Sequence, residues 1–296
     1  DFEMRSNAGA HCASIELHKA LCGERVDAFG DARGLTMAVT LFDDGPGVDI
    51  RWTLHDKEAT PLVESGHFTF PLAASAPEYR FDKLGSVVDP ARDIAPGANN
   101  RLYCAESFVD VCEEGRGLAI MLKDAPLFSL GEPAIYRYDR AYVAREPNVL
   151  GVAFANSWGT NFPQWMGGTL TCRYRLIPHE GDWRQAEVPR RALEWTRPPL
   201  AIEGAALPGE PMLRCPPGMR LLALKRAEDG DGYIARLIDL TGRGRTETLP
   251  VGSFVRRAQL CDGQEYNLRP LPIEGRAIAL DMRPFGLCTL RLHADG

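Results

Sequence analysis

The chain has 296 residues, of which 45% are hydrophobic and 25% charged, the balance of a soluble globular protein with one large or two ordinary domains. Its net charge of −6 offers no basic surface, so neither nucleic acid nor an anionic membrane is expected as a partner. No apolar run approaches the roughly 20 residues that span a bilayer, and the polar first residues do not form a signal peptide.

The first half of the chain is patterned mostly as β-strands. Residues 35–42 form a strand candidate, and the turn residues 43–47 lead into a second strand at 48–54, which is a hairpin pattern. Further strands are predicted at 117–122, 150–155 and 169–177. Few helices and long loops that contain Gly and Pro predict antiparallel sandwiches and disfavour an α/β barrel. Residues 1–34 carry no motif that we can interpret.

The segment 182–195 is the main helical exception. Asp182 is suited to cap its start, Pro189 must open a second turn or break the helix, and Pro198 and Pro199 end it. We therefore predict an all-β protein with three parts: a large antiparallel, supersandwich-like β-sandwich over residues 1–178, a short helical linker over 179–200, and a smaller β-sandwich over 201–296.

The small C-terminal region repeats the β pattern. Residues 220–225 and 233–240 read as strands joined by the turn Glu228-Asp229-Gly230-Asp231-Gly232. This turn could also be read as a calcium loop, but Tyr233 stands where an acidic ligand would be needed. The pattern favours a hairpin turn.

Eight cysteines are spread along the chain without a Cys-x-x-Cys pair. An even count is compatible with disulfides in a secreted chain, but a chain of this size does not need them. Several lie in apolar runs, where a thiol behaves as a small hydrophobic group. We expect reduced, buried thiols and a cytoplasmic location.

The segment Asn156-Ser157-Trp158-Gly159-Thr160-Asn161-Phe162-Pro163-Gln164-Trp165 gathers aromatic rings and amides after a predicted strand. A tryptophan face at such a strand end can stack on a sugar ring, and amides can bond its hydroxyls. The alternative is a structural loop whose tryptophans fill the edge of a core. Both interpretations stay open from the residues alone.

The same segment resembles one found in the C-terminal half of glycoside hydrolase family 38, the zinc-dependent α-mannosidases and their bacterial relatives. Further matches follow in order along the chain. Residues 56–61 and 64–71 are similar to the family's "DK-x-A…E…FPF" segment, residues 85–98 to "G-V-x-x-P…D-x-x-P-G", residues 123–127 to its "DAPL" turn, and residues 284–292 to the closing "PFEIKTLRL" strand. Gly286 departs from the usual Glu.

The resemblance implies a retaining mechanism in which a zinc ion holds sugar hydroxyls, an Asp attacks the anomeric carbon, and a second carboxylic acid protonates the leaving oxygen. In the family these groups lie in an N-terminal catalytic domain that is not recognisable here. We thus expect no zinc and no catalytic residue in this chain, and zinc in the missing domain. Because the chain begins at Asp1, we expect an excised segment or an incomplete reading of a longer gene.

The expected partners are that catalytic domain and a mannose-containing glycan, and a homo-oligomer is left open. The residues expected at the substrate groove or the domain interface are Asn156, Trp158, Asn161, Phe162, Gln164 and Trp165, together with His67 and Tyr79 from neighbouring family-like segments.

The sequence shows no motif for a metal site or a catalytic acid pair within this chain. The six histidines include no His-Glu-x-x-His pattern, and adjacent acids such as Asp43 and Asp44 point to opposite faces of an extended strand. A free-standing, non-catalytic carbohydrate-binding or assembly module is the main alternative. An autonomous hydrolase is disfavoured, because no persuasive acid pair is present.

Overall fold

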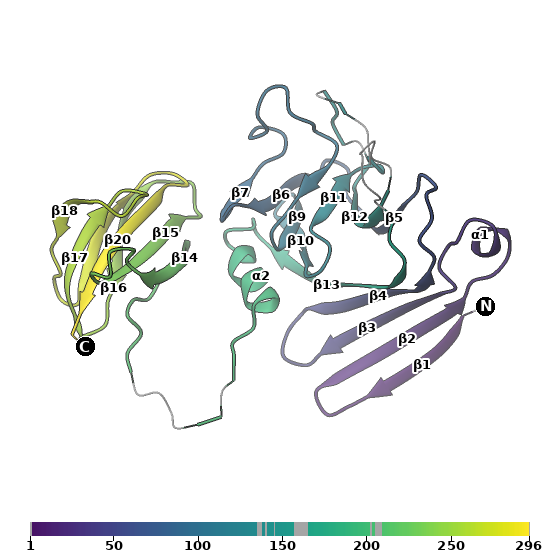
Figure 1. Ribbon diagram of the computed structural model, residues 1–296, viewed down its shortest axis with the longest axis horizontal. Helices are drawn as coiled ribbons and strands as arrows, with labels where there is room; N and C mark the ends of the chain where they lie inside the picture. The colour runs from purple at the N-terminus through teal and green to yellow at the C-terminus, as the bar shows by residue number, and fades with distance from the viewer. Residues whose placement is uncertain are drawn as a thin grey trace. The chain divides into compact units, whose positions relative to one another are not determined.

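The computed structural model describes residues 2–134, 138–139, 141–144, 146–156, 165–201, 203–204 and 209–295. The chain divides into two compact units (Figure 1). The larger unit comprises Asp1–Lys83 and Val88–Pro198, and the smaller one Leu84–Val87 and Pro199–Gly296. In the described part of the chain, no helix has the length and apolar character needed to cross a membrane.

The chain before Pro199 contains a nine-stranded and a four-stranded sheet. In pairing order the first consists of β1 (Glu3–Ala8), β2 (Cys12–Ala20), β3 (Gly34–Phe42), β4 (Val48–Lys57), β13 (Gly168–Glu180), β10 (Arg116–Leu122), β9 (Phe108–Glu113), β6 (Glu78–Lys83) and β7 (Ser86–Val88). The second consists of β5 (Ser65–Pro71), β12 (Asn148–Ala155), β11 (Leu127–Leu130) and β8 (Tyr103–Cys104).

The core of the larger unit lies between these sheets. Phe128 of the four-stranded sheet and Ile120 and Tyr174 of the nine-stranded sheet are fully buried. Trp52 of β4 stacks on Phe68 of β5, with ring centroids 5.4 Å apart. Alternate residues of the central strands point into this core, which is the pattern of two packed antiparallel sheets. The predicted all-β sandwich is confirmed.

A short α1 (Glu24–Asp27) follows β2, and the longer α2 (Val188–Thr196) follows β13. The Asp182 carboxylate accepts hydrogen bonds from the backbone N–H groups of Arg184 and Gln185 and so caps a turn before α2. Pro189 lies in the first turn of α2, where its missing N–H leaves no helical bond unmade. The helix contacts β9 and β10, so the helix predicted between the two sandwiches packs on the larger one.

The smaller unit has a five-stranded and a two-stranded sheet. Their strands, in pairing order, are β14 (Met219–Arg226), β15 (Tyr233–Asp239), β20 (Leu287–Ala294), β17 (Val255–Cys261) and β18 (Asn267–Leu271), and then β16 (Arg245–Pro250) and β19 (Ala277–Met282). This unit has a separate core, which includes the fully buried Leu237, Leu249, Ile278 and Leu290.

The turn between β14 and β15 is the predicted hairpin. The Arg291 guanidinium donates to both carboxylate oxygens of Asp229, at 2.8 and 2.9 Å, and to the backbone oxygen of Asp231, at 2.7 Å. The turn oxygens that suggested a calcium loop are therefore bound to a guanidinium of the same sheet.

Candidate functional site

The loop after β4 is held by a buried lysine. The Lys57 side chain is fully buried, and its Nζ donates to Glu64 Oε1 at 2.5 Å and to the backbone oxygen of Glu58 at 2.9 Å. The same ammonium lies 5.0 Å from the centroid of the Phe154 ring, a cation–π contact. A buried charge must be paired to be tolerated, so the 58–64 loop is tied back onto the end of its own strand.

Asn156 binds the same loop from the end of β12. Its Oδ1 accepts from the backbone N–H of Glu64 at 2.6 Å, and its Nδ2 donates to the backbone oxygen of Thr60 at 3.1 Å. The Asn156 backbone N–H donates to the Glu64 oxygen at 3.0 Å. Two of the segments that carried the family resemblance thus meet here, although 92 positions separate Glu64 from Asn156. The amide of Asn156 is used in fixing the loop.

Trp165 lies on the way from this cluster into β13. It is 44% exposed, and the following Met166 is 48% exposed. Gly167 passes so close to the loop that a Cβ on it would lie 2.7 Å from the backbone oxygen of Lys57 and from the backbone nitrogen of Ala59. The glycine therefore permits the close approach of the segment that follows Trp165 to the start of the loop. Trp158, Asn161, Phe162 and Gln164 lie outside the described residues.

A pocket of about 360 Å³ opens beside this loop, a size typical of small-molecule sites. Its wall is made by Leu62, Val63 and Glu64 of the loop and by Arg25, Phe29 and Asp31 around α1. Phe29 is 47% exposed and Val63 81% exposed. The pocket therefore presents an aromatic and an aliphatic surface beside a few charged groups, a combination that suits the apolar face of a sugar and its hydroxyls. We call the 58–64 loop, Asn156, Trp165 and this pocket the loop site.

The structure separates the two remaining predicted site residues, His67 and Tyr79. His67 lies on β5 near the loop site, with its Nε2 3.1 Å from Ser65 Oγ, and burial lowers its pKa, which keeps the ring neutral at pH 7. Tyr79 lies in the core, 8% exposed, and its hydroxyl donates to the backbone oxygen of Glu146 at 3.4 Å. Burial, with a smaller effect of Tyr142, raises the pKa of Tyr79 to about 12.

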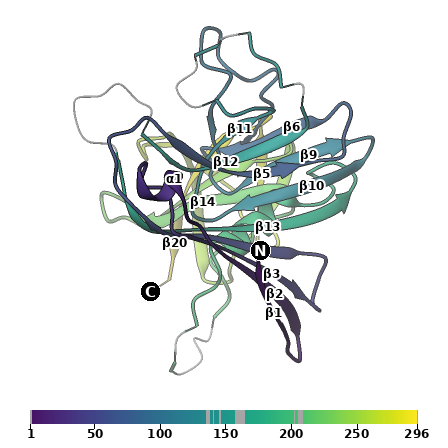
Figure 2. The same cartoon turned by 90° about the vertical axis from the view of Figure 1, so that its right-hand side faces the viewer.

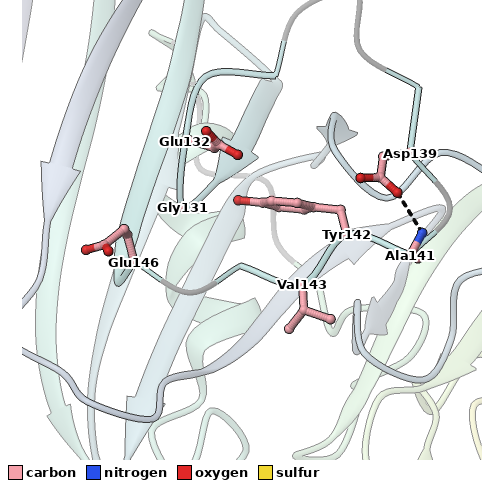
Figure 3. Close-up of a pocket in the computed structure, with 7 residues that line it drawn as sticks. All are labelled: Gly131, Glu132, Asp139, Ala141, Tyr142, Val143 and Glu146. Carbon is pink, nitrogen blue, oxygen red and sulfur yellow. Dashed lines mark hydrogen bonds between the residues drawn. The ribbon is translucent and has the colours of Figure 1, made fainter.

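A second pocket, of about 530 Å³, was not foreseen from the sequence (Figure 3). The side chains that Figure 3 draws around it include the carboxylates of Glu132, Asp139 and Glu146 and the ring of Tyr142. The Arg101 guanidinium lies 4.0 Å from the centroid of the Tyr142 ring and pairs with Glu132 at 2.9 Å. The carboxylates and the phenol group that line this pocket can accept hydrogen bonds from the hydroxyls of a polar ligand.

The residues of this second pocket carry no shared motif. Asp139 accepts a hydrogen bond from the backbone N–H of Ala141 at 2.8 Å, which holds the backbone before Tyr142 (Figure 3). The Tyr142 hydroxyl donates to the backbone oxygen of Leu130 at 2.9 Å. Because the residues that line the pocket all come from the connection between β11 and β12 and lie outside any strand, neither alternation nor motif spacing in the sequence indicates it.

A zinc site does not fit the described residues. Within the described ranges, no group of three or more His, Cys, Asp or Glu side chains is arranged to hold a metal ion. The donor set that a zinc ion requires is therefore not offered by this part of the chain.

Comparison with known proteins gives two kinds of similarity. The sequence model of the glycosyl hydrolases family 38 C-terminal beta sandwich domain matches residues 218–290, within the smaller unit. The fold of the whole chain is similar to that of an α-mannosidase from Enterococcus faecalis V583, with a TM-score of 0.68 and 17% identity over 98% of this chain and 35% of that one.

A second structure, of a glycosyl hydrolase family 38 protein from Enterococcus faecalis, gives the same TM-score and identity and is covered over 36% of its length. The chain thus spans about a third of the length of these structures. No curated protein sequence matches it. The smaller unit thus matches the glycosyl hydrolases family 38 C-terminal beta sandwich domain in sequence, and 98% of the chain shares the fold of part of these two structures.

Proposed function

We propose that the chain is the C-terminal, carbohydrate-contacting and structural portion of a retaining, zinc-dependent α-mannosidase-like glycoside hydrolase. The observation that supports this most is the similarity of 98% of the chain to about a third of an α-mannosidase structure, together with the family match in the smaller unit. The hydrolysis of α-mannosidic bonds then belongs to the whole enzyme.

In this proposal the loop site contributes a wall of the sugar groove. Lys57 and Asn156 fix the 58–64 loop, and Trp165 and Phe29 offer exposed rings to the apolar face of a mannose unit. Zinc, the nucleophile and the acid come from an N-terminal catalytic domain of the same protein. No step of the reaction is assigned to the residues of this chain.

The experiment compares the native-length protein with the 296-residue chain. We expect the native-length protein to hydrolyse p-nitrophenyl α-mannoside and to lose this activity on dialysis against a chelator, with recovery on adding Zn²⁺. The 296-residue chain should show no turnover. A native-length protein without turnover, or with turnover that survives removal of all metal, contradicts the proposal.

A free-standing carbohydrate-binding module is the second candidate, favoured by the exposed Phe29 ring in the pocket wall and by the exposed Trp165. It predicts that the 296-residue chain binds mannobiose in calorimetry and that Trp165→Ala removes this binding. Tyr266→Ala is the matched control, because Tyr266 is a 67% exposed aromatic residue of the smaller unit. Binding that both variants retain, or no binding at all, contradicts this candidate.

A cytoplasmic location is part of the proposal. All eight cysteines have free thiols, but only Cys172 and Cys261 are buried and Cys22 is exposed, so the expectation of buried thiols holds only in part. Burial raises the pKa of Cys172 and of Cys288 to about 11, so both are protonated and unreactive at neutral pH. Unpaired thiols of this kind suit a reducing compartment.

A further inference from the structure

The first three strands of the large sheet have one apolar and one polar face. In the strand register Met4 lies opposite Leu17, and Leu17 opposite Met37; the next row joins Ile15 to Val39. Alternate residues along each strand point to the same face, so these five share one face with Leu41. The opposite face carries Glu3, Arg5, Ser14, Glu16, Thr36 and Thr40. Such alternation is the pattern of a sheet that buries one side.

The apolar face of β1–β3 is continuous with the buried face of the sandwich. The row through Met37 continues to Trp52 of β4 and then to Cys172 of β13. Trp52 is covered by the second sheet through its stacking on Phe68, and Cys172 is only 5% exposed. The sandwich core therefore uses the same face of the sheet that β1–β3 extend.

The four-stranded sheet does not extend over β1, β2 and β3 of the nine-stranded sheet. Figures 1 and 2 both show β1, β2 and β3 projecting beyond β5, β11 and β12 of the second sheet. On these three strands Met4 is 67% exposed, Leu41 53% and Ile15 46%. Large apolar side chains on the side that is buried elsewhere in the same sheet indicate a face that packs against another surface, although Ser6 and Lys19 interrupt them.

The area of the apolar face of β1–β3 indicates which kind of partner it can hold. Three strands about 4.8 Å apart, with a rise of about 3.3 Å for each of some eight residues, present roughly 400 Å². A stable complex of separate proteins buries about 800 Å² on each partner, so the face is too small to hold a second copy of the chain by itself. A covalently linked partner needs less area, because its effective concentration is high. In the similar mannosidase structure only 35% of the chain is matched, so most of that polypeptide lies outside the matched region.

We propose that the apolar face of β1–β3 is the docking surface for a part of the same polypeptide that lies outside residues 1–296. This inference rests on the proposed function, because it requires the longer enzyme. It adds to that function the surface through which the C-terminal region is fixed to the rest.

Photo-crosslinking in the native-length protein tests the surface. A p-benzoylphenylalanine is introduced in place of Ile15 or Leu41 on the apolar face, and in place of Ser14 or Thr40 on the polar face as adjacent controls. After irradiation, mass spectrometry should find links from positions 15 and 41 to residues of the same polypeptide outside the 296-residue segment, and none from positions 14 and 40. Links to a second copy of the protein, equal linking from both faces, or no links overturn the inference.

A stability measurement complements the crosslinks. Ile15→Glu should lower the Tm of the native-length protein by more than about 3 °C, and Ser14→Glu should leave it unchanged. In the 296-residue chain Ile15→Glu should lower the Tm no more than Ser14→Glu does, because the exposed side of Ile15 is not covered by another segment there. A larger fall in the Tm of the 296-residue chain with Ile15→Glu than with Ser14→Glu would assign the side chain to the chain's own core and overturn the inference.

The two proposals fail in different ways. An intact mass that shows a native protein no longer than 296 residues overturns both at once. A longer, active mannosidase without crosslinks from positions 15 and 41 overturns the docking surface and leaves the proposed function standing.

Discussion

The residue with the clearest local role is Lys57, whose charge is buried against Glu64 and the Phe154 ring. Replacing it by methionine removes the ammonium but keeps the length of the side chain. Glu64 and the Glu58 oxygen then lose their donor, and Glu64 is only 24% exposed. We expect Lys57→Met to lower the free energy of unfolding by about 2–4 kcal/mol, measured by urea denaturation followed by tryptophan fluorescence.

The matched control for this prediction is Arg33→Met in the same region. Arg33 pairs with Glu58 at 2.8 Å, but both side chains are about half exposed, at 52% and 56%. An exposed ion pair contributes about 0–1 kcal/mol, so this variant should change the free energy of unfolding little. Equal losses in the two variants would show that the buried lysine has no special part in holding the loop.

A second buried pair, His179 with Asp110, should make stability depend on pH. Their side chains are 3% and 0% exposed, and Nε2 of His179 lies 2.7 Å from Oδ1 of Asp110. Burial lowers the pKa of His179, but the hydrogen bond to Asp110 and its charge outweigh this effect, and the pKa lies above its usual value. Burial also raises the pKa of Asp110, against the effect of His179.

A histidine with a raised pKa in the folded state stabilises the protein fully below its unfolded pKa of about 6.5. This stabilisation is lost as the pH rises through the folded value. The free energy of unfolding should therefore fall from pH 6.0 to pH 8.5 more in the wild type than in His179→Gln, which keeps a neutral donor to Asp110. His11→Gln, at an 86% exposed side chain, is the control and should follow the wild type. Identical pH slopes in all three proteins would contradict the assignment.

At the scale of elements, a glycine of β10 makes room for that histidine. Gly117 lies opposite His179 of β13, and a Cβ on it would meet the imidazole ring at 2.3 Å. A movement of the ring away from this Cβ would strain or break the hydrogen bond between its Nε2 and Asp110. Gly117→Ala should therefore cost about 1–3 kcal/mol of stability through overpacking, seen as a lower urea midpoint. Gly263→Ala, where a Cβ meets nothing within 4 Å, is the control and should be neutral.

Strands and hairpins were the part of the fold that the sequence predicted well. The predicted strand at 35–42 is β3 (Gly34–Phe42), and the strand at 169–177 lies within β13 (Gly168–Glu180). These elements are encoded locally, by alternation and by turn residues between strands. The opening hairpin β1–β2 was missed, because Ser6 and Lys19 interrupt its apolar positions and no motif marks it.

The candidate site was predictable only in part, for a reason that the Asn156 contacts illustrate. The sequence pointed to both the 56–71 and the 156–165 segments, but spacing does not encode that Asn156 binds Glu64 and Thr60 across the sheet. Tyr79 was grouped with them by its neighbouring motif and lies instead in the core. The stacking role of Trp158 and the roles of Asn161, Phe162 and Gln164 stay predictions.

At the scale of the whole molecule, each unit has its own buried core, so the two should unfold separately. Leu249 in the smaller unit and Ile120 in the larger one are both fully buried in these separate cores. Truncating either residue to alanine should cost about 2–5 kcal/mol. Differential scanning calorimetry should show two transitions, with Leu249→Ala lowering one and Ile120→Ala the other.

The two variants should also shift the Tm of their units by different amounts. A given loss of stability shifts the Tm of a domain of 60–100 residues by about 4–8 °C per kcal/mol, and that of a domain of 150–250 residues by about 2–4 °C per kcal/mol. The transition of the smaller unit should thus move roughly twice as far for the same loss. One cooperative transition that moves with either variant would mean that the two cores unfold as a single unit. The two units would then be separately packed but not independently stable.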